Sequence, residues 1–268
     1  MMPKYDTFDY QLHSVRQDFL TVGITIDRGE WQALRDDRPQ MQVFECHNMI
    51  IQTKVPQGIE DWQEAVKPNL PWAEDHFQER ISGEPLNPGE QYKNWPWYEQ
   101  GVEEHKPNGE FSHTYMERFW PYDATADHWG IRFPYGDLNT LIDLLRSRPY
   151  TRQAYLPIWF PEDLHAAMEP ERVPCTLGYH FQARPNMDRV KKPVLDVFYP
   201  MRSCDYYRYL RDDAYMAGRL LQWVAESVGM LPGKLTMHIV NLHIFANEFQ
   251  RLKDEHEKAK IERMSGAY

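Results

Sequence analysis

Several polar side chains in the second half of the 268-residue chain are of types that could hold a phosphorylated ligand at both ends. Arg202 and Ser203 are adjacent, and a cation beside a hydroxyl group suits a phosphate. Asp212 and Asp213 follow near the start of an amphipathic segment. An acid at a fixed distance from a phosphate site could contact the far end of the same ligand, as in a bound nucleotide. The alternative is that one of the two acids caps the following helix.

A cysteine could supply a nucleophile to such a site. Cys175 follows a proline at the start of a segment in which apolar residues alternate. A thiolate needs a nearby cation or hydrogen-bond donor, which Arg202 and Ser203 provide only if the fold brings them close. Without that contact, Cys175 is a small buried apolar residue.

Asn241, His243 and Phe245 fall on one face of a predicted strand, which indicates a hydrated or functional face. His238 and His243 lack the i, i+4 spacing of a helical metal pair. No other group of histidine, cysteine and acidic residues has ligand spacing, so we expect no metal site.

The elements that must position these side chains are a mixture of strands and helices. Apolar spacing predicts a helix over 137–147, and helices over 215–228 and 247–264. Strands are predicted over 41–52, 154–160, 173–181, 194–199 and 235–245. Residues 201–212 are interpreted as a polar connection from the last but one strand to the next helix. Strands and helices without strict alternation indicate an α+β fold with a large, mostly buried sheet, in one domain spanning 1–268.

The segment 53–110 is rich in proline and tryptophan, which predicts ordered loops with short helices inserted into that domain. Such loops usually cover or build a site. Trp95 and Trp97 are candidates to stack on a flat ligand ring, although packing in the core or an interface is the alternative for each.

Composition excludes several classes of partner. The net charge of −10 argues against a nucleic-acid polymer or an anionic membrane, because both attract basic surfaces. Three scattered cysteines are too few for a disulfide framework or a zinc cage. The first residues lack the apolar run of a signal peptide, and no stretch approaches the roughly 20 apolar residues of a membrane span. We therefore expect a cytoplasmic protein.

Four blocks in order along the chain resemble the thymidylate synthase superfamily. They are PYTRQAYLPIW (149–159), VPCTLGYHF (173–181), MRSCD (201–205) and NLHIFAN (241–247). Each block alone is weak, but four collinear blocks over 137–247 are specific. The resemblance implies an α+β fold in which a large mixed β-sheet is covered by helices and mediates a homodimer.

The resemblance also implies a substrate, a co-substrate and residue roles. The substrate is a pyrimidine nucleoside monophosphate, and the one-carbon donor is 5,10-methylenetetrahydrofolate. Cys175 matches the nucleophile that adds to C6 of the pyrimidine. Arg202 and Ser203 match phosphate ligands, and Arg152 matches an arginine that reaches the phosphate in the partner subunit's site. Gln153 replaces the second arginine of that pair, which weakens the clamp.

Further positions follow from the same resemblance. His243 and Phe245 occupy the positions that contact the sugar, although Phe245 lacks the family tyrosine's hydroxyl. Arg35 corresponds to a phosphate-binding arginine in a flexible loop. Glu79 corresponds to the glutamate that organises water and proton transfer. Asp205 matches a position that contacts the folate pterin, where Trp95 and Trp97 could stack.

The most informative departure lies eleven residues after Arg202. Thymidylate synthases have asparagine there, and this chain has Asp213. Asparagine matches O4 and N3–H of uracil, whereas cytosine presents an acceptor at N3 and a donor at the 4-amino group. A protonated acid, or a carboxylate facing N3-protonated cytosine, satisfies that reversed pattern. Phage deoxycytidylate hydroxymethylases carry an acid at this position, and they also resemble this chain in placing a residue other than histidine after the cysteine, here Thr176.

The sequence therefore predicts an enzyme that hydroxymethylates C5 of dCMP, in a host cytoplasm if the chain is phage-encoded. Three related readings stay open: a dCMP or CMP C5-methyltransferase, and a thymidylate synthase acting on dUMP. A relative without catalytic activity that binds nucleotides or a protein partner is the alternative from another class.

Overall fold

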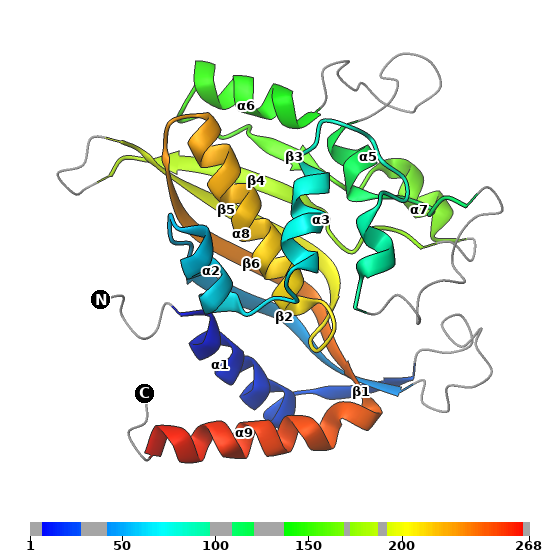
Figure 1. Ribbon diagram of the computed structural model, residues 1–268. Coiled ribbons are helices and arrows are strands. Elements are labelled where there is room, and N and C mark those ends of the chain that lie inside the picture. The colour runs from blue at the N-terminus through cyan, green and yellow to red at the C-terminus, as the bar shows by residue number, and fades with distance from the viewer. Residues whose placement is uncertain are drawn as a thin grey trace.

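The computed structural model describes residues 7–27, 42–96, 109–120, 137–168, 172–186 and 192–264. Arg35 and Trp97 lie outside the described residues. Within these ranges, one six-stranded sheet has the order β1-β2-β6-β5-β4-β3 (Figure 1). The strands are β1 Ile24–Asp27, β2 Gln42–Lys54, β3 Tyr155–Pro157, β4 Gly178–Arg184, β5 Val194–Asp205 and β6 Leu231–Phe245.

The sheet is mixed, because β5 and β6 run parallel and every other neighbouring pair is antiparallel. A parallel pair needs a crossover connection. Here the crossover is α8 (Leu210–Ser227), which packs on both β5 and β6. The two central strands and this helix carry most of the candidate site residues. The architecture is the α+β arrangement with a mixed sheet that the sequence predicts.

The helices gather on one face of the sheet in Figure 1. Around α8 lie α2 and α3, which both pack against it, while α1 packs on β2 and on α9. The remaining helices are α5, α6 and α7. Their bounds are α1 Phe8–Thr21, α2 Ile59–Val66, α3 Trp72–Arg80, α5 Tyr115–Phe119, α6 Asp137–Ser147, α7 Pro161–Ala166 and α9 Phe249–Met264, with 3₁₀ turns at Gln91–Asn94 and Ala246–Glu248.

Close packing between α2 and α8 fixes the layer above the sheet. The indole of Trp62 is fully buried, and its Nε1 donates a hydrogen bond to the Tyr215 carbonyl at 3.1 Å. The ring lies directly on Gly218, where an added Cβ would come within 2.3 Å of the indole nitrogen. Glycine at this position therefore lets the two helices approach, despite its low helix propensity.

Several sequence predictions of elements are confirmed. The helix over 137–147 has the predicted bounds, and strands are present at 41–52, 194–199 and 235–245, each extending beyond at least one predicted end. The segment 53–110 holds the short helices α2 and α3 in its described part.

Other predictions are wrong in their boundaries. Residues 201–205 continue strand β5 instead of forming a polar connection, and α8 begins at Leu210, before the predicted residue 215. The strand predicted from 173 begins only at Gly178, and the one predicted over 154–160 is limited to Tyr155–Pro157. The sequence analysis also missed α1.

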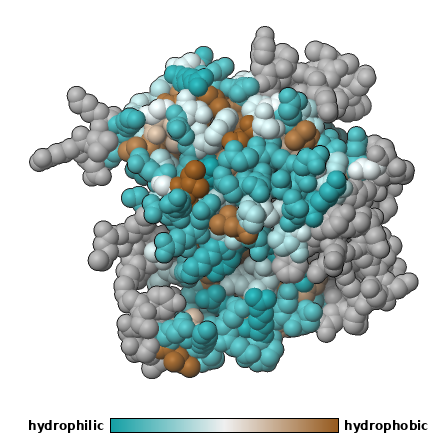
Figure 2. Space-filling view, in the orientation of Figure 1, coloured by the Kyte–Doolittle hydropathy of each residue, from teal (hydrophilic) through white to brown (hydrophobic). Residues whose placement is uncertain are grey.

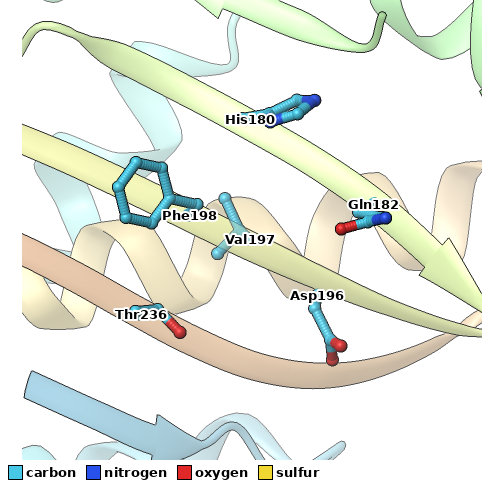
Figure 3. A pocket seen from close by; sticks show the side chains of 6 residues that line it. All are labelled: His180, Gln182, Asp196, Val197, Phe198 and Thr236. Carbon is cyan, nitrogen blue, oxygen red and sulfur yellow. The ribbon is translucent and has the colours of Figure 1, made fainter. Parts of the chain in front are cut away.

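The face of the sheet opposite α8 is not covered by the described helices, so the sheet is less buried in the single chain than predicted. Phe198 and Ile50 are 40% and 62% exposed on it. Side chains from β4, β5 and β6 line a hollow of about 190 Å³ there (Figure 3). By contrast, Figure 2 shows the helix-covered side, where small hydrophobic groups are scattered among hydrophilic residues. No helix in the described ranges has both the length and the apolar character needed to cross a bilayer.

Candidate active site

The segment that carries Cys175 is bound to the end of β5. The Arg202 amide donates to the Cys175 carbonyl at 2.8 Å, and the Leu177 amide donates to the Pro200 carbonyl at 2.9 Å. Thr176 forms an isolated antiparallel bridge with Met201. The fold therefore brings the backbone of Cys175 beside Arg202, which Ser203 follows along β5.

The guanidinium of Arg202 holds the backbone immediately before the cysteine. Its Nε donates to the Pro174 carbonyl at 2.8 Å, and one Nη donates to the Val173 carbonyl at 2.9 Å. The group also lies 5.8 Å from the ring centre of Trp159. A guanidinium has five N–H donors, so these bonds leave donors that can bind a phosphate.

The two central strands align the predicted sugar and phosphate ligands. Their parallel register places Ser203 beside Asn241 and Asp205 beside His243. Ser203 Oγ lies 3.3 Å from Nδ1 of His243, which is buried. The ring of Phe245 meets the His243 ring edge-on at 5.9 Å between centroids. These predicted ligands therefore form one polar group at the end of β5 and β6.

Asp205 is buried and closes the turn between β5 and α8. Its Oδ1 accepts hydrogen bonds from the amides of Tyr207 and Arg208, and its Oδ2 accepts from the Arg208 guanidinium at 2.8 Å. Arg208 also pairs with Glu248 at 3.1 Å and lies over the ring of Phe245. A carboxylate has about four lone-pair sites, so Asp205 retains capacity for one further donor.

The start of α8 shows whether Asp213 caps this helix. The helix begins at Leu210, and its N-cap residue is Tyr209. The carboxylate of Asp212 accepts hydrogen bonds from the backbone amide and the side-chain nitrogen of Asn69, each at 2.8 Å. Asp213 thus lies one turn inside the helix, where it is not a capping residue.

The environment of Asp213 favours its protonated form. The thiol of Cys204 donates to its Oδ2 at 3.7 Å. Burial raises the pKa of Asp213 to about 7; the positive charge of Arg80 opposes this, and the negative charge of Asp212 adds to it. Near neutral pH, Asp213 is therefore protonated in a large fraction of the molecules.

A cluster of hydroxyl groups lies beside Cys175. Tyr115 and Thr176 share a hydrogen bond of 2.7 Å, and Thr176 shares another of 2.8 Å with Tyr199. Burial raises the pKa of Tyr115, and the charges of Asp213 and, more weakly, Cys175 raise it further. Cys175 and Asp213 therefore lie in one neighbourhood. The sequence analysis missed Tyr115 and Tyr199, and Thr176, directly after the cysteine, was the available signal.

Glu79 lies near the end of α3, and its hydrogen bonds go to His76 and to the backbone of residues 90 and 91. Its Oε1 accepts from the amides of Glu90 and Gln91, and its Oε2 accepts from Nδ1 of His76 at 3.1 Å. Burial alone would raise the pKa of Glu79, but the bonds from His76 and Gln91 lower it overall. Burial lowers the pKa of His76 to about 4, with Arg80 adding to the effect, so this histidine is neutral. Glu79 is therefore an ionised group that fastens α3 to the following 3₁₀ turn.

The described part of the predicted folate side offers an aromatic surface. Trp95 is half-buried and stacks on Tyr209 with 5.6 Å between ring centroids. The amide of Tyr209 donates to the Asp205 carbonyl at 3.1 Å, so this aromatic pair lies next to Asp205. A flat pterin ring suits such a surface, and the remaining acceptor capacity of Asp205 suits its amino and N–H groups.

Arg152 lies apart from this group. It is exposed, forms no ion pair with a described residue, and its carbonyl lies 3.1 Å from Nε2 of His180 on β4. Among the described residues, no cluster of histidine, cysteine and acidic side chains could hold a metal ion.

Comparison with known proteins agrees with this geometry. Residues 85–265 match the thymidylate synthase family. The chain belongs to this family. It is 26% identical over 144 residues to a putative thymidylate synthase of Methanococcoides burtonii, covering 54% of this chain and 58% of that protein. It is 28% identical over 120 residues to a thymidylate synthase of Rhizobium rhizogenes, covering 44% and 38%.

A thymidylate synthase of Enterobacteria phage T4 is 26% identical over 114 residues, covering 42% of this chain and 36% of that protein. The chain thus spans less than two thirds of these relatives. The thymidylate synthase family uses methylenetetrahydrofolate to transfer a one-carbon unit to a pyrimidine nucleotide.

Proposed function

We propose that the protein is a deoxycytidylate 5-hydroxymethyltransferase. It transfers the one-carbon unit of 5,10-methylenetetrahydrofolate to C5 of dCMP, and addition of water gives 5-hydroxymethyl-dCMP. The observation that carries the proposal is the buried Asp213, eleven residues after Arg202, with a pKa of about 7. Burial raises the pKa values of the neighbouring Cys204 thiol and of the Tyr115 and Tyr199 phenols. The carboxyl group of Asp213 is therefore the group suited to donate a proton to a base near neutral pH.

Asp213 is suited to the amino-pyrimidine edge. Its protonated carboxyl group donates to N3 of cytosine and accepts from the 4-amino group. A proton on N3 withdraws electrons from the ring and makes C6 more open to attack. A ring nitrogen takes a proton more readily than the O4 carbonyl of uracil, so this assistance favours cytosine. A general acid works best when its pKa lies near the operating pH, as it does here.

The other residues hold the nucleotide while this occurs. Arg202 and Ser203 bind the phosphate, and His243 and Phe245 contact the sugar. Cys175 adds its sulfur to C6, which makes C5 a nucleophilic carbon. Methylenetetrahydrofolate supplies the one-carbon unit that C5 attacks. Asp205, Trp95 and Trp97 hold the pterin, Glu79 orders water on that side, and Arg35 contributes to phosphate binding.

We also propose that the enzyme is a homodimer formed through the uncovered face of the sheet. Phe198 and His180 lie on this face together with the hollow in Figure 3. Arg152 belongs to the same edge, because its carbonyl contacts His180. Its exposed side chain then reaches the phosphate in the partner's site, as the family resemblance implies.

Product analysis tests the reaction directly. The protein is incubated with methylenetetrahydrofolate and dCMP, dUMP or CMP, and the product mass is measured. Hydroxymethylation of dCMP adds one carbon, two hydrogens and one oxygen. A product lighter by one oxygen would show a C5-methyltransferase instead. Exclusive turnover of dUMP would show a thymidylate synthase, the activity named for the relatives, and would overturn the proposal.

A further inference from the structure

An ion pair beside the proposed sugar position has no role in the reaction described so far. Arg208 lies in the turn between β5 and α8, and Glu248 ends the 3₁₀ turn that follows β6. Their charged groups are 3.1 Å apart, and their side chains are only 19% and 14% exposed. Both charges are therefore largely withdrawn from water but keep some accessible surface.

The pair is built around Phe245, which is proposed to contact the sugar. The guanidinium carbon of Arg208 lies 4.5 Å from the ring centre of Phe245. The backbone amide of Phe245 donates to Oε2 of Glu248 at 2.9 Å. The phenyl ring meets His243 edge-on, and Nδ1 of His243 lies 3.3 Å from Oγ of Ser203. Contacts therefore run without a break from a proposed phosphate ligand to the ion pair.

Asp205 holds the guanidinium in this place. Its Oδ2 accepts a hydrogen bond from Arg208 at 2.8 Å, and its Oδ1 accepts from the backbone amide of the same residue at 3.0 Å. The guanidinium is thus fixed between two carboxylates and against an aromatic ring. A side chain that is already ordered loses less conformational entropy when a ligand binds it.

The chemistry of the sugar explains what such a pair can bind. dCMP carries a single hydroxyl group on its sugar, at C3′, and Phe245 offers only an apolar ring to it. A hydroxyl group both accepts and donates a hydrogen bond. Placed at the ion pair, it can accept from the guanidinium of Arg208 and donate to the carboxylate of Glu248. Hydrogen bonds to charged groups are stronger than those between neutral groups.

We propose that the pair formed by Arg208 and Glu248 binds the 3′-hydroxyl group of the nucleotide and selects nucleotides that carry it. This inference deepens the proposed function, on which it rests for the position of the sugar. It concerns the sugar alone and holds for either pyrimidine base.

Two nucleotides that differ only in the 3′-hydroxyl group test the proposal. Calorimetry measures the Kd of dCMP and of 2′,3′-dideoxycytidine 5′-monophosphate, without folate and without turnover. The parent protein should bind dCMP about 10-fold more tightly or better, because a site built to bind a hydroxyl group rejects the analogue that lacks it. In Arg208→Met, which keeps a side chain over Phe245, the ratio of the two Kd values should approach one.

A structural ion pair predicts a different result. If the pair only fastens the 3₁₀ turn to the start of α8, Arg208→Met weakens the binding of both nucleotides alike and preserves their ratio. Glu248→Gln keeps an acceptor for the Phe245 amide and should give a ratio between those of the parent and Arg208→Met. If Arg208→Met does not fold, a parent-like ratio in folded Glu248→Gln overturns the proposal.

Arg251→Met is the matched control. The guanidinium carbon of Arg251 lies 4.1 Å from the ring centre of Tyr207, and its Nε is 2.9 Å from Glu255. It therefore has the same kinds of contact, with an aromatic ring and a carboxylate, among residues that have no proposed role in binding. Its replacement should leave the ratio at the parent value.

A second pair of nucleotides separates this inference from the proposed choice of base. It consists of dUMP and 2′,3′-dideoxyuridine 5′-monophosphate. If only this pair binds and its ratio falls in Arg208→Met, the sugar assignment stands and the choice of cytosine fails. A ratio near one in the parent for both pairs overturns the sugar assignment even if dCMP is hydroxymethylated. A variant that changes only the preference between dCMP and CMP would place the ion pair at the 2′ position and also overturn it.

Discussion

The thiol of Cys175 owes its place to backbone bonds with Arg202 and to the side chain of Arg202 on Pro174 and Val173. Replacement of this thiol separates covalent catalysis from binding. Cys175→Ala should abolish both product formation and exchange of tritium from C5 of the nucleotide, because both require addition at C6. Cys46→Ala, which removes a thiol buried in the core, should retain exchange in its folded fraction. Exchange that survives in Cys175→Ala would remove Cys175 from the nucleophile role.

Asp213 also makes the stability of the protein depend on pH. Burial raises its pKa from 3.8 to about 7, so between these values the folded protein holds a proton that the unfolded chain releases. The contribution of Asp213 to stability therefore falls as the pH rises from about 4 to about 7, and is constant above that.

Urea unfolding of the parent protein and Asp213→Asn at pH 4.5 and pH 8 measures this effect. Relative to the variant, the parent should lose on the order of 2–4 kcal/mol between the two pH values. An equal difference at both pH values would mean that the carboxyl group ionises normally in the folded protein.

At the level of elements, the contact of α2 with α8 depends on the absence of a side chain at Gly218. In an exposed helix, Gly218→Ala would stabilise the helix by about 1 kcal/mol, because alanine has the higher helix propensity. Here its Cβ meets the Trp62 indole, so we expect a net loss of about 1–3 kcal/mol. Trp62→Phe in the same chain removes the indole atoms nearest to the new methyl group and should recover part of that loss. Chemical denaturation of the two single variants and the double variant measures the coupling.

The sequence correctly predicted elements whose apolar spacing reflects one face buried in the core. The helix over 137–147 and the strands containing residues 43 and 239 are examples, because one of their faces is buried. It was insufficient for 201–205, where Arg202, Ser203 and Asp205 interrupt the apolar alternation of a strand. Their polar side chains do not follow the apolar alternation by which the sequence predicts strands.

The candidate site shows the same division. Motif order located Cys175 in the segment before β4, Arg202 on β5 and Asp213 on α8. Tyr115 is far from them in the sequence and belongs to no motif, so only the packing of α5 reveals it. The raised pKa of Asp213 likewise arises from burial inside the fold, which the sequence does not show.

At the scale of the whole molecule, the uncovered sheet face predicts an assembly. Phe198→Glu would place a charge on that face, where a second copy is proposed to pack, and should convert the dimer into monomers. Ile261→Glu changes a more exposed apolar residue on α9 and should leave the dimer intact. Sedimentation velocity measures both variants. A parent protein that is monomeric at micromolar concentration, or a dimer that survives Phe198→Glu, would contradict this interface.

The central claim concerns the enzyme's choice of base, and it assigns that choice to one carboxyl group. The most direct test is the ratio of kcat/KM for dCMP to that for dUMP, measured in the parent protein and in Asp213→Asn. An unmet buried pairing costs about 1–3 kcal/mol, so the ratio should fall by roughly 10–100-fold in the variant, with dUMP turnover rising relative to dCMP. A ratio that is the same in both proteins would contradict the account.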